Sequence, residues 1–120
     1  MLFKDDQHRA FYNSAIEETN SQNDRERKAL FYTLGLTSET KNNINHLYGF
    51  QKNYIRPEGL KKSWQTGATI RICRLAFNLY NGTYGDDLAE SRYYTPYNLF
   101  DYGLLMPYML EAVKILYVYK

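Results

Sequence analysis

Residues that build cross-links and metal sites are scarce in this chain of 120 residues, which has one cysteine and two histidines. Because Cys73 is alone, it excludes an intramolecular disulfide and argues against a cysteine-based zinc site. His8 and His46 are isolated, and neither stands at metal-ligand spacing from a clear partner. We therefore expect a reducing compartment, a small core hydrophobe at Cys73, and a packed His8 whose ring nitrogen is satisfied.

Long apolar runs and an excess of charge of one sign are also missing. No uninterrupted apolar stretch could cross a bilayer, and the N-terminal MLFKDDQHR turns charged after three residues, unlike a signal peptide. The formal net charge of +2 at pH 7 gives no whole-protein field that would attract nucleic acid. These absences predict a soluble, cytoplasmic protein with no membrane partner.

Tyrosine, in contrast, is plentiful. The chain contains 13 tyrosines and 6 phenylalanines. Tyrosine joins a large apolar ring to a hydroxyl that needs water or a partner. The simpler interpretation of any single tyrosine is a place at the wet boundary of the core. Because there are so many of them, we also expect some to form an exposed aromatic patch.

The spacing of apolar residues predicts the helices. A first helix is expected over residues 5–19, capped by Asp5 or Asp6. Asp24 is a suitable N-cap for a second helix over 25–34 that ends at Gly35, and a third helix is expected from residue 37 or 38 to 49. Further helices are predicted over 60–65, 70–81, from Thr95–Pro96 onward and over 108–117, with irregular segments at 51–59 and 83–94.

The stretch from Ile70 to Tyr80, IRICRLAFNLY, decides the predicted architecture. At ~100° per residue its polar side chains, with Asn81, share an arc of roughly 80°, and all the others are apolar. A helix that shows so little of itself to water is enclosed by its neighbours. We therefore predict an all-α fold, a compact bundle of about five or six helices around a central helix at 70–81, in one domain over 1–120.

The polar residues of that helix, here called the polar seam, are the first candidate binding site. They are Arg71, Arg74, Asn78 and Asn81. Arginine with planar amides on a rigid helix suits the recognition of carboxylate, phosphate or backbone groups. The alternative is structural, because arginines on a nearly buried helix pair with carboxylates of their own chain, such as Asp101 or Glu111.

A second candidate site is the basic cluster formed by Arg25, Arg27 and Lys28. Basic side chains that converge near tyrosines would provide stacking and phosphate contacts for nucleic acid. Glu26 interrupts the cluster, however, and the alternative is a solvated surface of mixed charge.

Sequence signatures of catalysis are missing. The chain has no GxSxG motif, and Cys73 lies among apolar neighbours, where a thiol stays protonated. Asp86, Asp87 and Glu90 are close in sequence, but they fall in the predicted 83–94 loop, where a solvated charge run is expected. We therefore expect no catalytic residue, no metal and no cofactor, and we predict that the chain is not an enzyme.

Three segments carry a resemblance to a known family. They are RKALFYTLGLT at 27–37, INHLYGFQKNYIRPEGL at 44–60 and RLAFNLYNG at 74–82. They resemble a family of small uncharacterised proteins from Gram-positive Firmicutes and from the phages and conjugative elements these bacteria carry. The resemblance implies a cytosolic bacterial protein that is an accessory of a mobile element. It assigns no functional residue, because the family has no established activity.

These observations lead to one function and two alternatives. We expect a non-enzymatic binding protein that blocks a protein partner by steric occlusion, as an anti-CRISPR-like inhibitor of host defence would. A small accessory that binds nucleic acid is one alternative, and an enzyme with an unrecognised site is the other. The final helix carries only Glu111 and Lys114 as charges, so we also predict a homodimer that covers it.

Overall fold

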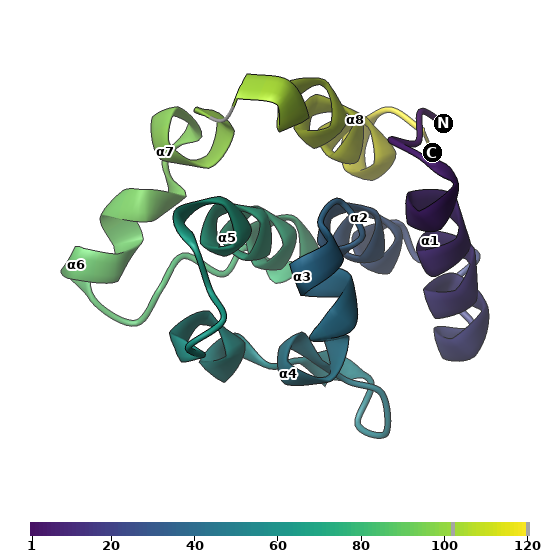
Figure 1. Ribbon diagram of the computed structural model, residues 1–120, viewed down its shortest axis with the longest axis horizontal. Helices are drawn as coiled ribbons and strands as arrows, with labels where there is room; N and C mark the ends of the chain where they lie inside the picture. Colours follow the sequence, from purple (N-terminus) through teal and green to yellow (C-terminus); the bar gives the residue numbers. More distant parts are fainter. Residues whose placement is uncertain (102, 120) are drawn as a thin grey trace.

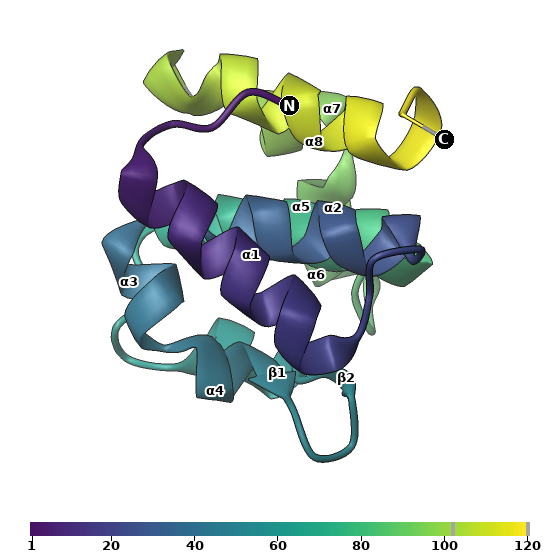
Figure 2. The ribbon, with the colours of Figure 1, turned by 90° about the vertical axis from the view of Figure 1, so that its right-hand side faces the viewer.

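The computed structural model describes residues 1–101 and 103–119, and within these residues the fold is mostly helical. Its longest helices are α1 (Asp6–Thr19), α2 (Arg25–Leu34), α5 (Gly67–Asn81) and α8 (Met106–Tyr117). Helices α2 and α5 lie side by side in a middle layer, with α8 above them and α1 crossing beside α2 (Figures 1 and 2). The predicted helical class and compact arrangement are therefore confirmed.

Side-chain caps define where the helices begin. The Asp5 carboxylate accepts a hydrogen bond from the backbone N–H of His8 at the start of α1, and Asp24 accepts one from Arg27 at the start of α2. Thr66 and Thr69 form a capping box for α5. The predicted end of this helix is also confirmed, because Gly82 follows it in the left-handed conformation with φ of 78°.

The third predicted helix is wrong in part. Instead of one helix to residue 49, the structure has α3 (Ser38–Asn42), α4 (Ile44–Leu47) and the strand β1 (Tyr48–Gly49). Strand β1 pairs antiparallel with β2 (Tyr54–Ile55), and the 3₁₀ helix η1 (Pro57–Lys61) follows. The chain leaves the helical path because Tyr48 lies in the core, where its hydroxyl donates to Asn53 in the hairpin turn. The two-residue strands are too short to show an alternating pattern.

The segment after α5 is more ordered than expected. Residues 83–94 are not one irregular loop, because they contain α6 (Leu88–Ser91) and the 3₁₀ helix η2 (Arg92–Tyr94). The Asp87 carboxylate caps α6 by accepting from the backbone N–H of Glu90. Helix α7 (Pro96–Phe100) begins at the predicted Thr95–Pro96 cap, and η3 (Gly103–Leu105) leads into α8. Helices α6 and α7 lie at one edge of the molecule (Figure 1).

Helices α2 and α5 share the centre of the core. Every residue of α2 from Ala29 to Leu34 is buried, and α5 buries nine of its residues, including Cys73. The predicted enclosure of the 70–81 helix is correct, with α2 packed against it as a second central helix. Within the described residues, no helix is both long enough and apolar enough to span a membrane.

Several tyrosines occupy the boundary between core and polar groups, as expected. Tyr32 is fully buried, yet its hydroxyl donates to the backbone carbonyl of Leu2. The N–H of Leu2 in turn donates to the carboxylate of buried Glu111 in α8, with an N–O distance of 3.1 Å. These bonds fasten the N-terminal residues beside α8, as Figure 2 shows.

Candidate functional site

Arg74, the most buried member of the polar seam, is bound to a carboxylate of its own chain. Its Nε and Nη2 atoms donate to the two carboxylate oxygens of Glu90 in α6, at 3.0 and 2.8 Å. Its guanidinium also lies over the ring of Tyr93, 4.3 Å from the centroid. The structural alternative thus describes Arg74 correctly but misidentifies its partner, which is Glu90 rather than Asp101 or Glu111. The expectation that Glu90 is a solvated charge is wrong.

The other seam residues also bind their own chain. The Nη1 atom of Arg71 donates to the backbone carbonyl of Asp101 at 2.7 Å, and the Asn78 amide donates to the carbonyl of Thr83 at 3.0 Å. The Asn81 amide donates to the hydroxyl of Tyr54 in β2, also at 3.0 Å. The seam therefore fastens the hairpin and the segment after α5 to the central helix.

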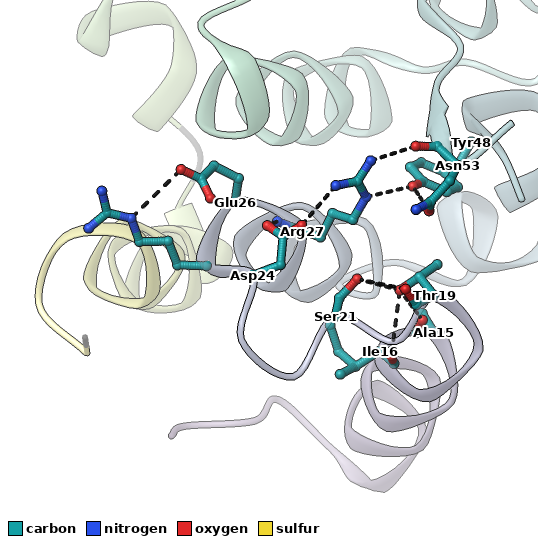
Figure 3. Close-up of polar contacts among 10 residues, drawn as sticks. Ala15, Ile16, Thr19, Ser21, Asp24, Glu26, Arg27, Tyr48 and Asn53 are labelled. Atoms are coloured by element: carbon teal, nitrogen blue, oxygen red, sulfur yellow. Dashed lines mark hydrogen bonds and ion pairs between the residues drawn. The ribbon is translucent and has the colours of Figure 1, made fainter.

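The basic cluster is also partly engaged within the protein, because Arg27 points inward. It donates to the Tyr48 hydroxyl, to the Asn53 carbonyl and to its own capping residue Asp24, as Figure 3 shows. Burial alone would lower the pKa of Arg27, but the bonds to Tyr48 and Asp24 outweigh it and raise that pKa. Arg27 is thus a fixed cation that holds the hairpin against α2.

The remaining members of the cluster stay near the surface. Arg25 is exposed and lies 3.7 Å from the Glu26 carboxylate, and Lys28 is half-buried. Because Arg27 is engaged inside, the structure does not bring the three cations together on one open face.

A pocket of about 680 Å³ opens between the polar seam of α5 and residues 83–94. Its walls are the segment from β2 to η1, the exposed side of α5, and residues 83–94. Arg74 and Asn81 contribute from the seam, and Glu90, Tyr93 and Tyr54 contribute from the other walls. The sequence did not identify the last three, because Glu90 and Tyr93 approach α5 through the path of the chain after Gly82, and Tyr54 approaches it through the β1–β2 hairpin. This cavity, here called the edge pocket, is large enough for a small ligand or a protruding side chain.

Hydrogen bonds within the chain hold Glu90 in the wall of the edge pocket. Tyr94 is buried, and its hydroxyl lies 3.4 Å from a carboxylate oxygen of Glu90. Burial, together with the charge of Glu90, raises the pKa of Tyr94 to about 12. The phenol therefore stays protonated and acts as a donor, so Glu90 is held from two sides, by Arg74 and by Tyr94.

The described residues contain no group of three or more histidine, cysteine or acidic side chains that could hold a metal ion. Cys73 is buried, with the amide of Gln65 donating to its sulfur at 3.5 Å, and burial raises the pKa of the thiol to about 12. Such a thiol is not a nucleophile at neutral pH. His8 is fully buried between the backbone of Tyr32 and that of Lys4, as expected for a packed histidine.

Large side chains stand exposed along residues 83–97, here called the edge segment. Tyr84 is 66% exposed, Leu88 90% and Tyr97 78%. Tyr93 and Arg92 lie between them, with the guanidinium of Arg92 4.9 Å from the ring centroid of Tyr93. Other residues of the edge segment supply one wall of the edge pocket, whereas Tyr84, Leu88 and Tyr97 are not among the lining residues.

The fold and this arrangement define a small helical protein with an aromatic edge beside a pocket of mixed charge. The whole chain, residues 1–120, matches the family of unknown function DUF6075, and the protein belongs to that family. The match confirms the expected membership of a family without an assigned activity, and it leaves the link to Firmicutes and their mobile elements as a prediction. Neither the curated proteins nor the solved structures gave a match.

Proposed function

We propose that this protein is a non-enzymatic binding protein that acts on a protein partner by steric occlusion through its edge segment. One observation carries the proposal: Tyr84, Leu88 and Tyr97 are exposed on a single segment that also forms a wall of the edge pocket. Exposed apolar side chains that gather on one segment are typical of interaction sites, and tyrosine and arginine supply much of the binding energy at interfaces.

In this proposal the binding surface is the edge segment and not the polar seam. The side chains of Arg74, Asn78 and Asn81 already donate hydrogen bonds within the chain. A partner that accepted hydrogen bonds from these side chains would first have to break the internal ones. The side chains of Tyr84, Leu88 and Tyr97 are covered by little of the protein, and their burial by a partner would gain hydrophobic energy without such a loss.

The proposed biological setting is a phage or another mobile element, with a host defence protein as the partner. The resemblance to proteins of such elements supports this setting, and occlusion needs no catalytic group. The nucleic-acid alternative has less support, because Arg27 of the basic cluster is bound inside the protein.

Capture from a host lysate tests the proposal. The purified chain is compared with a Tyr84→Ala/Leu88→Ala/Tyr97→Ala variant and with a control, Leu104→Ala, which removes an apolar side chain that is 93% exposed and lies outside the edge segment. We expect one host protein, identified by mass spectrometry, to be retained by the wild type and the control and lost by the edge variant.

Two results would overturn the proposal. Capture that the edge variant retains, or no specific capture at all, would remove the edge as a protein-binding surface. Binding of DNA or RNA that falls steeply with salt would favour the nucleic-acid alternative instead.

A further inference from the structure

The geometry points to the edge pocket as a receptor for a cationic side chain, an arginine or lysine presented by the partner protein. This inference rests on the proposed function and adds the chemistry of the partner. Its basis is the set of charges that line the cavity, some of which are already neutralised within the protein.

Carboxylates outnumber cations in the edge pocket. Its described lining residues include four acidic side chains, Glu58, Asp86, Asp87 and Glu90, and three basic ones, Lys61, Arg74 and Arg92. Arg74 and Glu90 neutralise each other through two short hydrogen bonds. Three carboxylates and two cations remain, so the cavity is negative in a chain whose formal net charge is +2.

Two of the three cations that line the pocket are engaged within the protein, and the third, Lys61, is exposed at the end of η1. Arg92 is held against Tyr93, donating to its hydroxyl at 2.8 Å. Arg74, the cation deepest in the wall, has both its Nε and Nη2 atoms on Glu90. A phosphate or carboxylate would have to displace Glu90 and would meet the other carboxylates, so the pocket disfavours it.

Glu58 and Asp86 line the cavity from two different segments, η1 and the edge segment, and both are exposed. No ion pair within the described residues engages either of them. The described acidic residues form no group that could hold a metal ion. A guanidinium or ammonium group does not need such a shell, because it binds separated carboxylates and the faces of aromatic rings such as that of Tyr54.

Nuclear magnetic resonance titration of the full ¹⁵N-labelled chain tests the inference. The probes are N-acetyl-arginine amide and N-acetyl-lysine amide, with N-acetyl-glutamate amide as the anionic control. We expect the cationic probes to shift amides of 54–61 and 83–94 with saturation, and the glutamate probe to leave them unchanged.

Charge-matched variants complete the test. Glu58→Gln/Asp86→Asn should weaken the cationic probes about fivefold, the effect of losing two exposed charge contacts. Glu17→Gln/Glu18→Gln removes the same charge from exposed positions of α1 and should leave affinity unchanged. Equal weakening by both variants, equal shifts from the glutamate probe, or no shifts from the cationic probes would overturn the inference. Lysate capture that persists when the cationic probes fail would leave the proposed function standing without it.

Discussion

Replacing Glu90 by glutamine removes the charge that holds Arg74 and keeps the shape of the side chain. Shape matters here, because Glu90 packs so closely on Gly85 that a Cβ at that glycine would lie 2.6 Å from the Glu90 Cγ atom. Glutamine leaves this packing in place, so the change isolates the ion pair between α5 and α6.

The exposure of the pair sets the expected size of the effect. Removing one partner of a buried pair costs about 3–5 kcal/mol, whereas exposed pairs are worth about 0.2–1 kcal/mol. The side chains of Arg74 and Glu90 are 11% and 29% exposed, between these limits. We expect Glu90→Gln to lower the free energy of unfolding by about 1–2 kcal/mol, and the melting temperature of a chain this long by about 4–8 °C.

Thermal and urea unfolding, followed by circular dichroism, measure this effect. Glu58→Gln is the matched control, because it makes the same chemical change in the same pocket at a carboxylate without an ion pair among the described residues. It should alter stability by less than about 0.5 kcal/mol. If both variants had the same melting temperature and urea midpoint as the wild type, Glu90 would not hold Arg74. The polar seam would then again be a candidate binding site.

Three further predictions address packing, pH and assembly. Gly35→Ala should lower the free energy of unfolding by about 1–3 kcal/mol, because a Cβ at that position would lie 2.8 Å from the Cδ2 atom of His8. Gly67→Ala is the control and should leave stability unchanged, because a Cβ there would have no atom within 4 Å. The urea midpoints of the two variants distinguish these outcomes. Burial lowers the pKa of His8, so the unfolded state binds its proton more readily and stability should fall as the pH drops below 6.5, a dependence lost in His8→Gln. We also propose a homodimer through the outer face of α8, where Leu110 and Tyr117 are exposed. Light scattering should give the mass of a dimer for the wild type and of a monomer for Leu110→Glu. A monomeric wild type would refute the homodimer.

The sequence predicts those parts of the fold that depend on neighbours along the chain. The starts of α2 and α7 follow from Asp24 and from Thr95–Pro96, because a cap acts within one helical turn. The enclosure of α5 follows from its narrow polar seam. Gly35 ends α2 as expected, but with φ of −81°, so its lack of a side chain serves close packing rather than a left-handed turn.

Contacts between distant residues could not be predicted in this way. The sequence neighbours of Arg27 predict a surface cluster, yet Arg27 binds Tyr48, 21 residues away. Glu90 was assigned to solvent by the polarity around it, yet it binds Arg74 across 16 residues. Periodicity shows which face of a helix is polar, whereas the partner of that face depends on where the connecting segments run.

Amide hydrogen exchange tests in one experiment whether the polar seam is internal and whether the edge segment binds the partner. In the free protein, α2 and α5 should exchange most slowly. When the captured host protein is bound, protection should rise over residues 83–97 and 54–61 and stay unchanged over 71–81. Fast exchange in α5 of the free protein, or new protection confined to regions outside the edge segment, would contradict the account.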